Sequence, residues 1–128
     1  KTIVITWNKE KASDELDPML QLMQSNYFRG KVLTVDKLNG HTDLFHAMKA
    51  LGSEGITSLL VEGGTTLSTS FLKAGLVDQI ELFISPKILG GGARSIAGLG
   101  IDRMDEILTF RSVSWTRIGE DMLLTAKF

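Results

Sequence analysis

The sequence contains no cysteine and only two histidines, and these absences exclude several kinds of site. Without cysteine the chain can form no disulfide, no thiolate nucleophile and no cysteine-based zinc site. His41 and His46 are too few, and lie too near expected loop and helix surfaces, to build a metal centre, so we predict none. A chain without cysteine also favours a reducing cytoplasm as its location.

The sequence also lacks a charge bias and a long apolar run. Its 14 basic and 15 acidic residues give a net charge of −1 and are spread along the chain, so we expect no nucleic-acid or membrane partner. No apolar run approaches the roughly 20 residues of a membrane span, and no signal-peptide pattern opens the chain. The 128 residues, 43% of them hydrophobic, suffice for one domain with a real core.

Residues 57–75 read as a strand, a glycine turn and a helix in direct succession, and the rest of the chain is organised around them. Residues 58–61 form an apolar run that is long enough for a strand covered on both faces and too short for a helix. Gly63 and Gly64 are expected to let the backbone turn sharply and approach a ligand with no side chain in the way.

A helix is predicted to begin at this turn, with Thr65 or Thr66 as its cap. Its apolar residues at helical spacing are Leu67, Phe71 and Leu72. Gly75 fits the left-handed position just past a helix end, with Leu76 placed to fold back on Phe71. A capped helix start presents backbone N–H groups and the positive end of the helix dipole, as phosphate binding requires.

Two interpretations of the Gly-Gly turn stay open on spacing alone. Many strand-to-helix turns use two glycines only to make the bend, and this turn is neither a G-x-G-x-x-G fingerprint nor a P-loop. Glu62 favours a ligand site, because open α/β sheets bind ligands at the carboxyl ends of their strands. A carboxylate buried there is costly unless some group donates a hydrogen bond to it.

The first half of the chain alternates strands with helices. Residues 3–5 and 31–35 read as strands, and the pattern between them predicts a helix capped by Asp14 or Asp17. Asp43 is predicted to cap another helix. That helix carries Leu44, Met48 and Leu51 at helical spacing and is closed by Gly52 and Gly55. The alternation argues for a parallel sheet with right-handed crossovers.

The second half reads as β structure. Residues 78–84 alternate polar and apolar side chains, which predicts a strand with Ile80, Leu82 and Ile84 on one face. Residues 105–115 and 121–128 read as two more strands, joined by a hairpin-like connection. We therefore predict an α/β fold with three layers and a mostly parallel central sheet that carries an antiparallel C-terminal strand pair.

Three motifs in this order resemble the C-terminal reductase domain of the bifunctional riboflavin-biosynthesis deaminase/reductase. They are Leu60-Val-Glu-Gly-Gly-Thr-Thr-Leu67, Phe71-Leu-Lys-Ala-Gly-Leu-Val-Asp-Gln-Ile80 and Ile84-Ser-Pro-Lys-Ile-Leu-Gly-Gly-Gly92. Together they are far more specific than the Gly-Gly turn, and a weaker match extends back to Thr6 and forward to Phe128. The resemblance implies a dihydrofolate-reductase-like fold and a single reductase domain over residues 1–128.

The resemblance also implies a reaction on a small-molecule substrate. Members of this family use NADPH to reduce the ribosylamino carbon of 5-amino-6-(5-phosphoribosylamino)uracil, which opens the sugar to a ribityl chain. By position, Glu62 matches the family glutamate that contacts the substrate, and Thr6 matches a hydroxyl residue near the adenosine portion of NADP. The positions that match the turn and helix start holding the cofactor's phosphates are Gly63, Gly64, Thr65, Thr66 and Leu67.

Lys9 and Lys11 follow Thr6 closely, and their role stays open. A cation at that place would favour the 2′-phosphate of NADP over NAD, whereas a solvated charged loop accounts for the same residues.

The chain begins at Lys1, without Met and almost directly in a strand, so we expect the first part of the domain to be missing. Residues that contact the nicotinamide are expected in that part, and we assign no catalytic residue. The H-x-E and P-C-x-x-C ligands of the deaminase cannot occur in a cysteine-free chain. Uncovered strand edges would favour pairing, so we expect a homodimer or another homo-oligomer.

Two other functions stay open. One is a dihydrofolate-reductase-like oxidoreductase that acts on another heterocyclic substrate. The other is a non-catalytic nucleotide-binding or dimerisation fragment that keeps the Gly-Gly turn without the chemistry.

Overall fold

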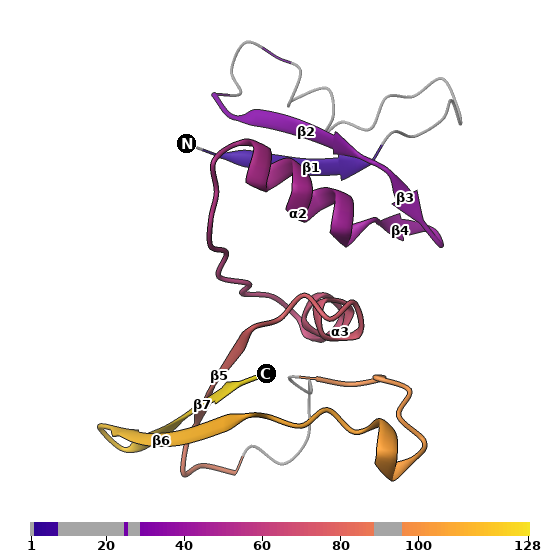
Figure 1. Cartoon of the computed structure of the whole chain (residues 1–128). Helices are drawn as coiled ribbons and strands as arrows, with labels where there is room; N and C mark the ends of the chain where they lie inside the picture. Colours follow the sequence, from indigo (N-terminus) through magenta and orange to yellow (C-terminus); the bar gives the residue numbers. More distant parts are fainter. Residues whose placement is uncertain (1, 8–24, 26–28, 89–95) are drawn as a thin grey trace. The chain divides into compact units, whose positions relative to one another are not determined.

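The computed structural model describes residues 2–7, 25, 29–88 and 96–128, and shows an α/β chain (Figure 1). The chain divides into two compact units, Lys1–Leu59 and Leu60–Phe128. Each unit contains β-strands and, within its described residues, one α-helix. The α/β class is therefore confirmed, while the three-layer arrangement stays a prediction. None of the helices in the described ranges is long and apolar enough to cross a membrane.

The first unit contains a parallel strand pair, as the sequence predicts. Strand β1 (Ile3–Trp7) runs beside β2 (Lys31–Val35) in a register that pairs Thr6 with Thr34. Strand β1 is two residues longer than predicted, because Thr6 and Trp7 have strong β propensity and continue the ladder. The predicted helix capped by Asp14 or Asp17 lies outside the described residues.

A short hairpin follows that sequence reasoning missed. It consists of β3 (Lys37–Leu38) and β4 (His41–Thr42), which pair antiparallel across a two-residue turn. Both turn residues have positive φ, 51° at Asn39 and 84° at Gly40, which is the type I′ geometry. Asn-Gly is the strongest local signal for this turn, so the sequence did carry the information.

Helix α2 (Leu44–Ser53) begins and ends with its own capping contacts. The Asp43 carboxylate accepts a hydrogen bond from the His46 N–H at 3.1 Å, which confirms the predicted cap. At the other end Gly55 has φ 80°, and the Ile56 N–H donates to the Leu51 carbonyl at 3.2 Å. Only Gly55 closes the helix, because Gly52 lies inside it.

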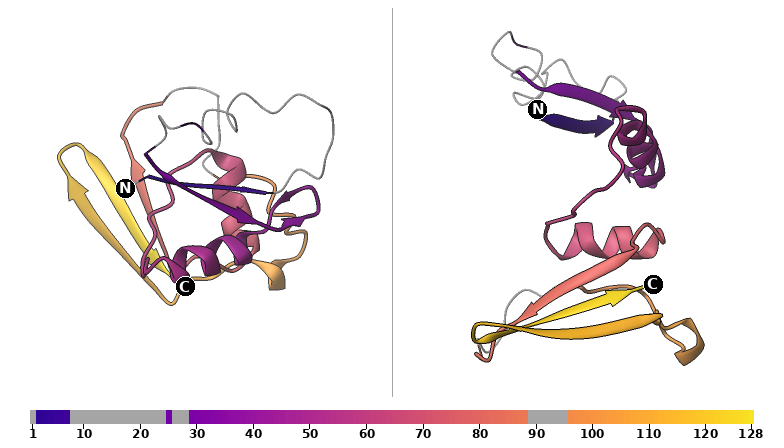
Figure 2. Two further views of the ribbon diagram at one scale, coloured as in Figure 1. Left: turned by 90° about the horizontal axis from the view of Figure 1, so that it is seen from above. Right: turned by 60° about the vertical axis from the view of Figure 1, so that its left-hand side comes forward.

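The second unit contains an antiparallel sheet in the order β5-β7-β6 (Figure 2). Its strands are β5 (Gln79–Ile84), β6 (Ser112–Ile118) and β7 (Asp121–Lys127). The antiparallel C-terminal pair is confirmed. Strand β6 starts later than predicted, because a 3-10 turn, η1 (Met104–Glu106), occupies the start of that segment. The β6–β7 hairpin turns at Gly119, whose φ is 63°.

One face of this sheet is mainly apolar, and we call it the apolar sheet face. The register places on it the charged Arg117, which pairs with Met122, and eight apolar residues from all three strands: Ile80, Leu82, Ile84, Val113, Trp115, Met122, Leu124 and Ala126. The predicted common face of the three β5 residues is part of it. Ala126 is fully buried, yet Trp115 and Val113 are 55% and 51% exposed.

The predicted central strand at residues 58–61 is not present. Residues 56–64 form no strand, and Leu59 and Leu60 are 48% and 77% exposed. A strand is held by hydrogen bonds to a neighbouring strand, and no described strand pairs with this segment. The prediction of a buried strand leading into the glycine turn is therefore wrong.

Candidate functional site

Helix α3 (Thr65–Lys73) is labelled in Figure 1, and in the sequence it directly follows the two glycines. Gly64 is the N-cap, with extended backbone at φ −74° and ψ 172°, and its carbonyl accepts from the Ser68 N–H at 3.2 Å. The predicted cap by Thr65 or Thr66 is wrong, because both threonines already lie in the first helical turn. The N–H groups of Thr66 and Leu67 thus precede the helical ladder at the positive end of the helix dipole.

The two glycines of the turn have different roles. Neither has positive φ, so the predicted need for glycine to make a sharp turn is wrong. A Cβ at Gly63 would lie 2.8 Å from Leu67 Cδ2 and 3.3 Å from Leu67 Cβ, whereas a Cβ at Gly64 would meet nothing within 4 Å. The absence of a side chain at Gly63 therefore leaves room for Leu67 in its present position, and Gly64 leaves open space beside the helix start.

The end of α3 confirms the predicted glycine stop. Gly75 has φ 64°, and the Leu76 N–H donates to the Phe71 carbonyl at 3.1 Å. Phe71 and Leu72 are buried as predicted, but Leu67 is 42% exposed and does not belong to the buried face. The third buried residue of the helix is Thr69 instead.

Thr69 joins the helix to a distant part of the chain, and sequence reasoning missed it. Its hydroxyl donates to the Ala97 carbonyl at 2.9 Å and accepts from the Ala97 N–H at 3.2 Å. A contact between residues 28 positions apart leaves no mark on local periodicity, so no pattern in the sequence could have revealed it.

The other predicted site residues lie as follows. Glu62 is exposed, so the argument from the cost of burying its carboxylate is wrong. It directly precedes the turn, and the structure thus brings it together with residues 63–67. Thr6 is half-buried in β1 of the first unit, and its proximity to the turn stays a prediction. Lys9 and Lys11 lie outside the described residues.

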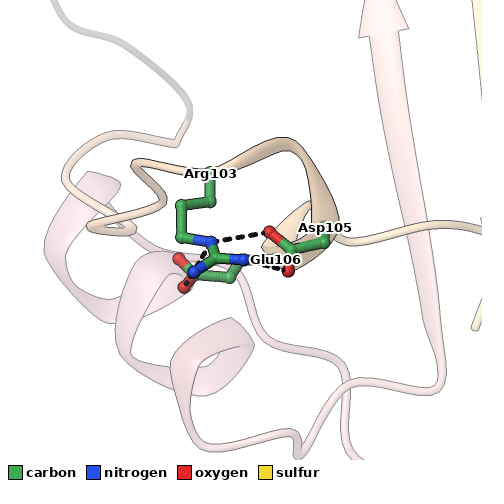
Figure 3. Close-up of polar contacts among 3 residues, drawn as sticks. All are labelled: Arg103, Asp105 and Glu106. Atoms are coloured by element: carbon green, nitrogen blue, oxygen red, sulfur yellow. Dashed lines mark hydrogen bonds and ion pairs between the residues drawn. The ribbon is translucent and has the colours of Figure 1, made fainter.

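A charged cluster lies at η1, within the described part of the second unit (Figure 3). Arg103 donates through Nε and Nη2 to the two Asp105 carboxylate oxygens at 2.9 and 2.7 Å, and the Glu106 carboxylate lies 4.0 Å from Nε. The Arg103 side chain, followed by the backbone, holds the pKa of Asp105 below its usual value. No group of three or more metal-binding side chains occurs in the part of the chain that the structure describes.

Comparison with known proteins gives the family. Residues 1–124 match the sequence profile of the RibD C-terminal domain. The chain belongs to this family. It is 36% identical over 126 residues to the riboflavin biosynthesis protein RibD of Aquifex aeolicus, which covers 98% of this chain and 32% of that protein.

Two further relatives agree. The chain is 38% identical over 84 residues to the 2,5-diamino-6-ribosylamino-4(3H)-pyrimidinone 5′-phosphate reductase of Methanothermobacter thermautotrophicus, which covers 64% of this chain and 39% of that enzyme. The structure of the riboflavin biosynthesis reductase of Saccharomyces cerevisiae superposes with a TM-score of 0.67 at 16% identity, covering 98% of this chain and 67% of that one. The latter likeness shows a shared fold. The chain spans about a quarter to a third of the RibD relatives.

Proposed function

We propose that this chain is part of an NADPH-dependent reductase of riboflavin biosynthesis, which reduces 5-amino-6-(5-phosphoribosylamino)uracil to the ribityl product. The observation that carries the proposal is the family match over residues 1–124, which includes the Gly-Gly turn and the start of α3. The Methanothermobacter relative is named for a ribosylaminopyrimidine carrying a 5′-phosphate, and this supports the same substrate class.

The start of α3 fits the cofactor's pyrophosphate. The first turn of α3 contains no acidic residue, and the space beside Gly64 is open. A phosphate there would accept hydrogen bonds from the N–H groups of Thr66 and Leu67 and would be favoured by the helix dipole. In this proposal Gly63 leaves room for the Leu67 side chain, and the position of that side chain shapes the turn. Thr6 stays a proposed neighbour of the adenosine portion.

Glu62 is the proposed substrate contact. It lies two positions before Gly64 along the chain, a span of at most about 7 Å, so one bound pair of ligands can touch both. Its exposed carboxylate is free to accept hydrogen bonds from the sugar hydroxyls of the substrate. NADPH would supply the hydride, and the residues of this chain would hold the two reactants in reach of each other.

Turnover tests the proposal directly. The natural protein that carries these residues should oxidise NADPH when the phosphoribosylaminouracil is supplied, and not when it is omitted. Absence of turnover under these conditions would refute the proposal. Oxidation with dihydropterin in place of the uracil would favour the dihydrofolate-reductase-like alternative, and binding of NADPH without any turnover would favour the non-catalytic one.

The apolar sheet face supports our expectation of a homodimer, and the cytoplasm stays the location that we propose from the cysteine-free sequence. Trp115 and Val113 expose about half of their surface on a face whose one charged residue by register is Arg117, and exposed apolar patches mark association surfaces. We propose that a second copy covers them. Trp115→Glu should convert the dimer to a monomer in analytical ultracentrifugation, whereas Glu81→Gln on the opposite face should not. A wild-type monomer would contradict the proposal.

A further inference from the structure

We propose that Thr69 is a positioning residue for the cofactor site, because it fixes the segment 96–98 against the first turns of α3. The inference rests on the proposed binding of NADPH at the start of that helix. It assigns a role to a residue that neither the family motifs nor the sequence pattern singled out.

The contact has an unusual form for a surface helix. Thr69 is the one buried polar side chain in the described part of the protein, with 6% of its surface exposed. A single hydroxyl serves both backbone groups of Ala97, donating to the carbonyl and accepting from the N–H. Removing the hydroxyl while keeping the shape would therefore leave two backbone groups without their partner at once.

The place of this contact connects it to the cofactor site. Thr69 lies four residues after Thr65, so both stand on one side of α3, about 6 Å apart along the helix axis. The segment at Ala97 thus lies roughly one helical turn from the start of the helix. A dinucleotide whose pyrophosphate occupies that start is long enough to reach this segment.

Among the described residues, Thr69 is the one that hydrogen-bonds to residues 96–101. Residues 96–101 belong to no strand or helix, and both Gly98 and Gly100 have left-handed backbone, with φ of 71° and 73°. The chain therefore changes direction close to Ala97 and gains no support there from a regular element. The hydroxyl of Thr69 sets the distance between this segment and the helix.

The test uses two variants of the natural protein. Thr69→Val keeps the β-branched shape and lacks the hydroxyl, and Thr69→Ser keeps the hydroxyl as the matched control. Because two backbone hydrogen bonds are lost, we expect Thr69→Val to raise KM for NADPH by roughly fivefold to tenfold, with kcat and KM for the pyrimidine changed less than about twofold. Thr69→Ser should stay within about twofold of the wild type throughout. An unchanged KM for NADPH in a folded Thr69→Val protein would overturn the proposal, as would an equal rise in Thr69→Ser.

Amide hydrogen exchange separates this proposal from the proposed function. Without cofactor, the Ala97 amide should exchange at least about tenfold faster in Thr69→Val than in the wild type, because its acceptor is gone. Unchanged exchange would refute the positioning role whatever the activity shows. In the wild type, saturating NADPH should slow exchange at Ala97 and leave the Gly119 turn unaffected, a result that needs no variant to fold. Failure of NADPH to bind would instead refute the proposed function.

Discussion

Helices α2 and α3 end in the same way but begin differently, and we relate the different start of α3 to ligand binding. Both helices stop at a glycine with left-handed backbone, Gly55 after α2 and Gly75 after α3. In each case the N–H of the residue after that glycine donates a hydrogen bond to a carbonyl in the last turn of the helix. At its start α2 is capped by the carboxylate of Asp43, whereas the cap of α3 is Gly64, which has no side chain. The first helix satisfies its own N-terminus, and the second leaves room there for another group.

Giving α3 a side-chain cap like that of α2 should have the largest effect on NADPH affinity. Gly64→Asp places a carboxylate at the cap, where it can accept from the helix N–H groups and repel a phosphate. The backbone at Gly64 is extended, so the change should leave the fold intact. We expect NADPH affinity, measured by calorimetry, to fall by about a hundredfold or more.

Gly64→Val provides the uncharged control for this prediction. It fills the same open space without adding charge and should weaken NADPH binding less than Gly64→Asp does. Unchanged affinity in both variants would remove the turn from the cofactor site.

Glu62→Gln tests whether the residue before the Gly-Gly turn contacts the substrate or the cofactor. The amide keeps the shape of the side chain and loses the charge, so hydrogen bonds from sugar hydroxyls should weaken. We expect kcat/KM for the pyrimidine to fall by about tenfold, with NADPH affinity within about twofold of the wild type. Steady-state kinetics and calorimetry together give the answer. A parallel loss of both would mean that Glu62 supports the turn rather than the substrate.

Asp43→Ala tests the side-chain cap at the start of α2. Removing the α2 cap should lower the free energy of unfolding by about 1 kcal/mol, because the His46 N–H loses its acceptor. Urea denaturation measures the change, and NADPH affinity should not move. Asp43→Ser keeps a capping oxygen and should lose only a few tenths of a kcal/mol. A drop in cofactor affinity would show that the two helix starts are not independent.

The smallest effect is expected for the exposed ion pair of Arg103 and Asp105 at η1, which lies at the start of neither α2 nor α3. Arg103→Ala should raise the pKa of Asp105 towards its usual value, and Arg103→Lys should raise it less. Because the folded pKa lies below the unfolded one, the pair stabilises the protein at neutral pH, and this is lost as pH falls through the folded pKa. A carboxyl NMR titration checks the shift. An unchanged Asp105 titration would mean that Arg103 is not the cause.

Local signals predicted the elements well. Asp43, Gly55 and Gly75 were read correctly, because caps and left-handed stops depend on a few adjacent residues. The parallel pairing of β1 with β2 followed from the alternation of strands and helices. The Asn39-Gly40 hairpin carried an equally local signal and was overlooked.

The failures concern properties that adjacent residues do not determine. The apolar run at 58–61 is a strand only if a neighbour pairs with it, and Glu62 is buried only if that strand is. The position of Leu67 next to Gly63 depends on the folded backbone, and the partner of Thr69 lies 28 residues away. For the site, the sequence predicted a helix directly after the Gly-Gly turn, but it placed the cap at Thr65 or Thr66 instead of Gly64 and could not predict how the two glycines divide their roles.

The packing of Leu67 over Gly63 makes these two positions one energetic unit. A methyl group at position 63 would collide with the Leu67 side chain, and a shorter side chain at position 67 would relieve the collision. The two substitutions should therefore be non-additive, with a double-mutant coupling of about 1 kcal/mol. We expect relatives with a larger residue at position 63 to carry a smaller one at position 67.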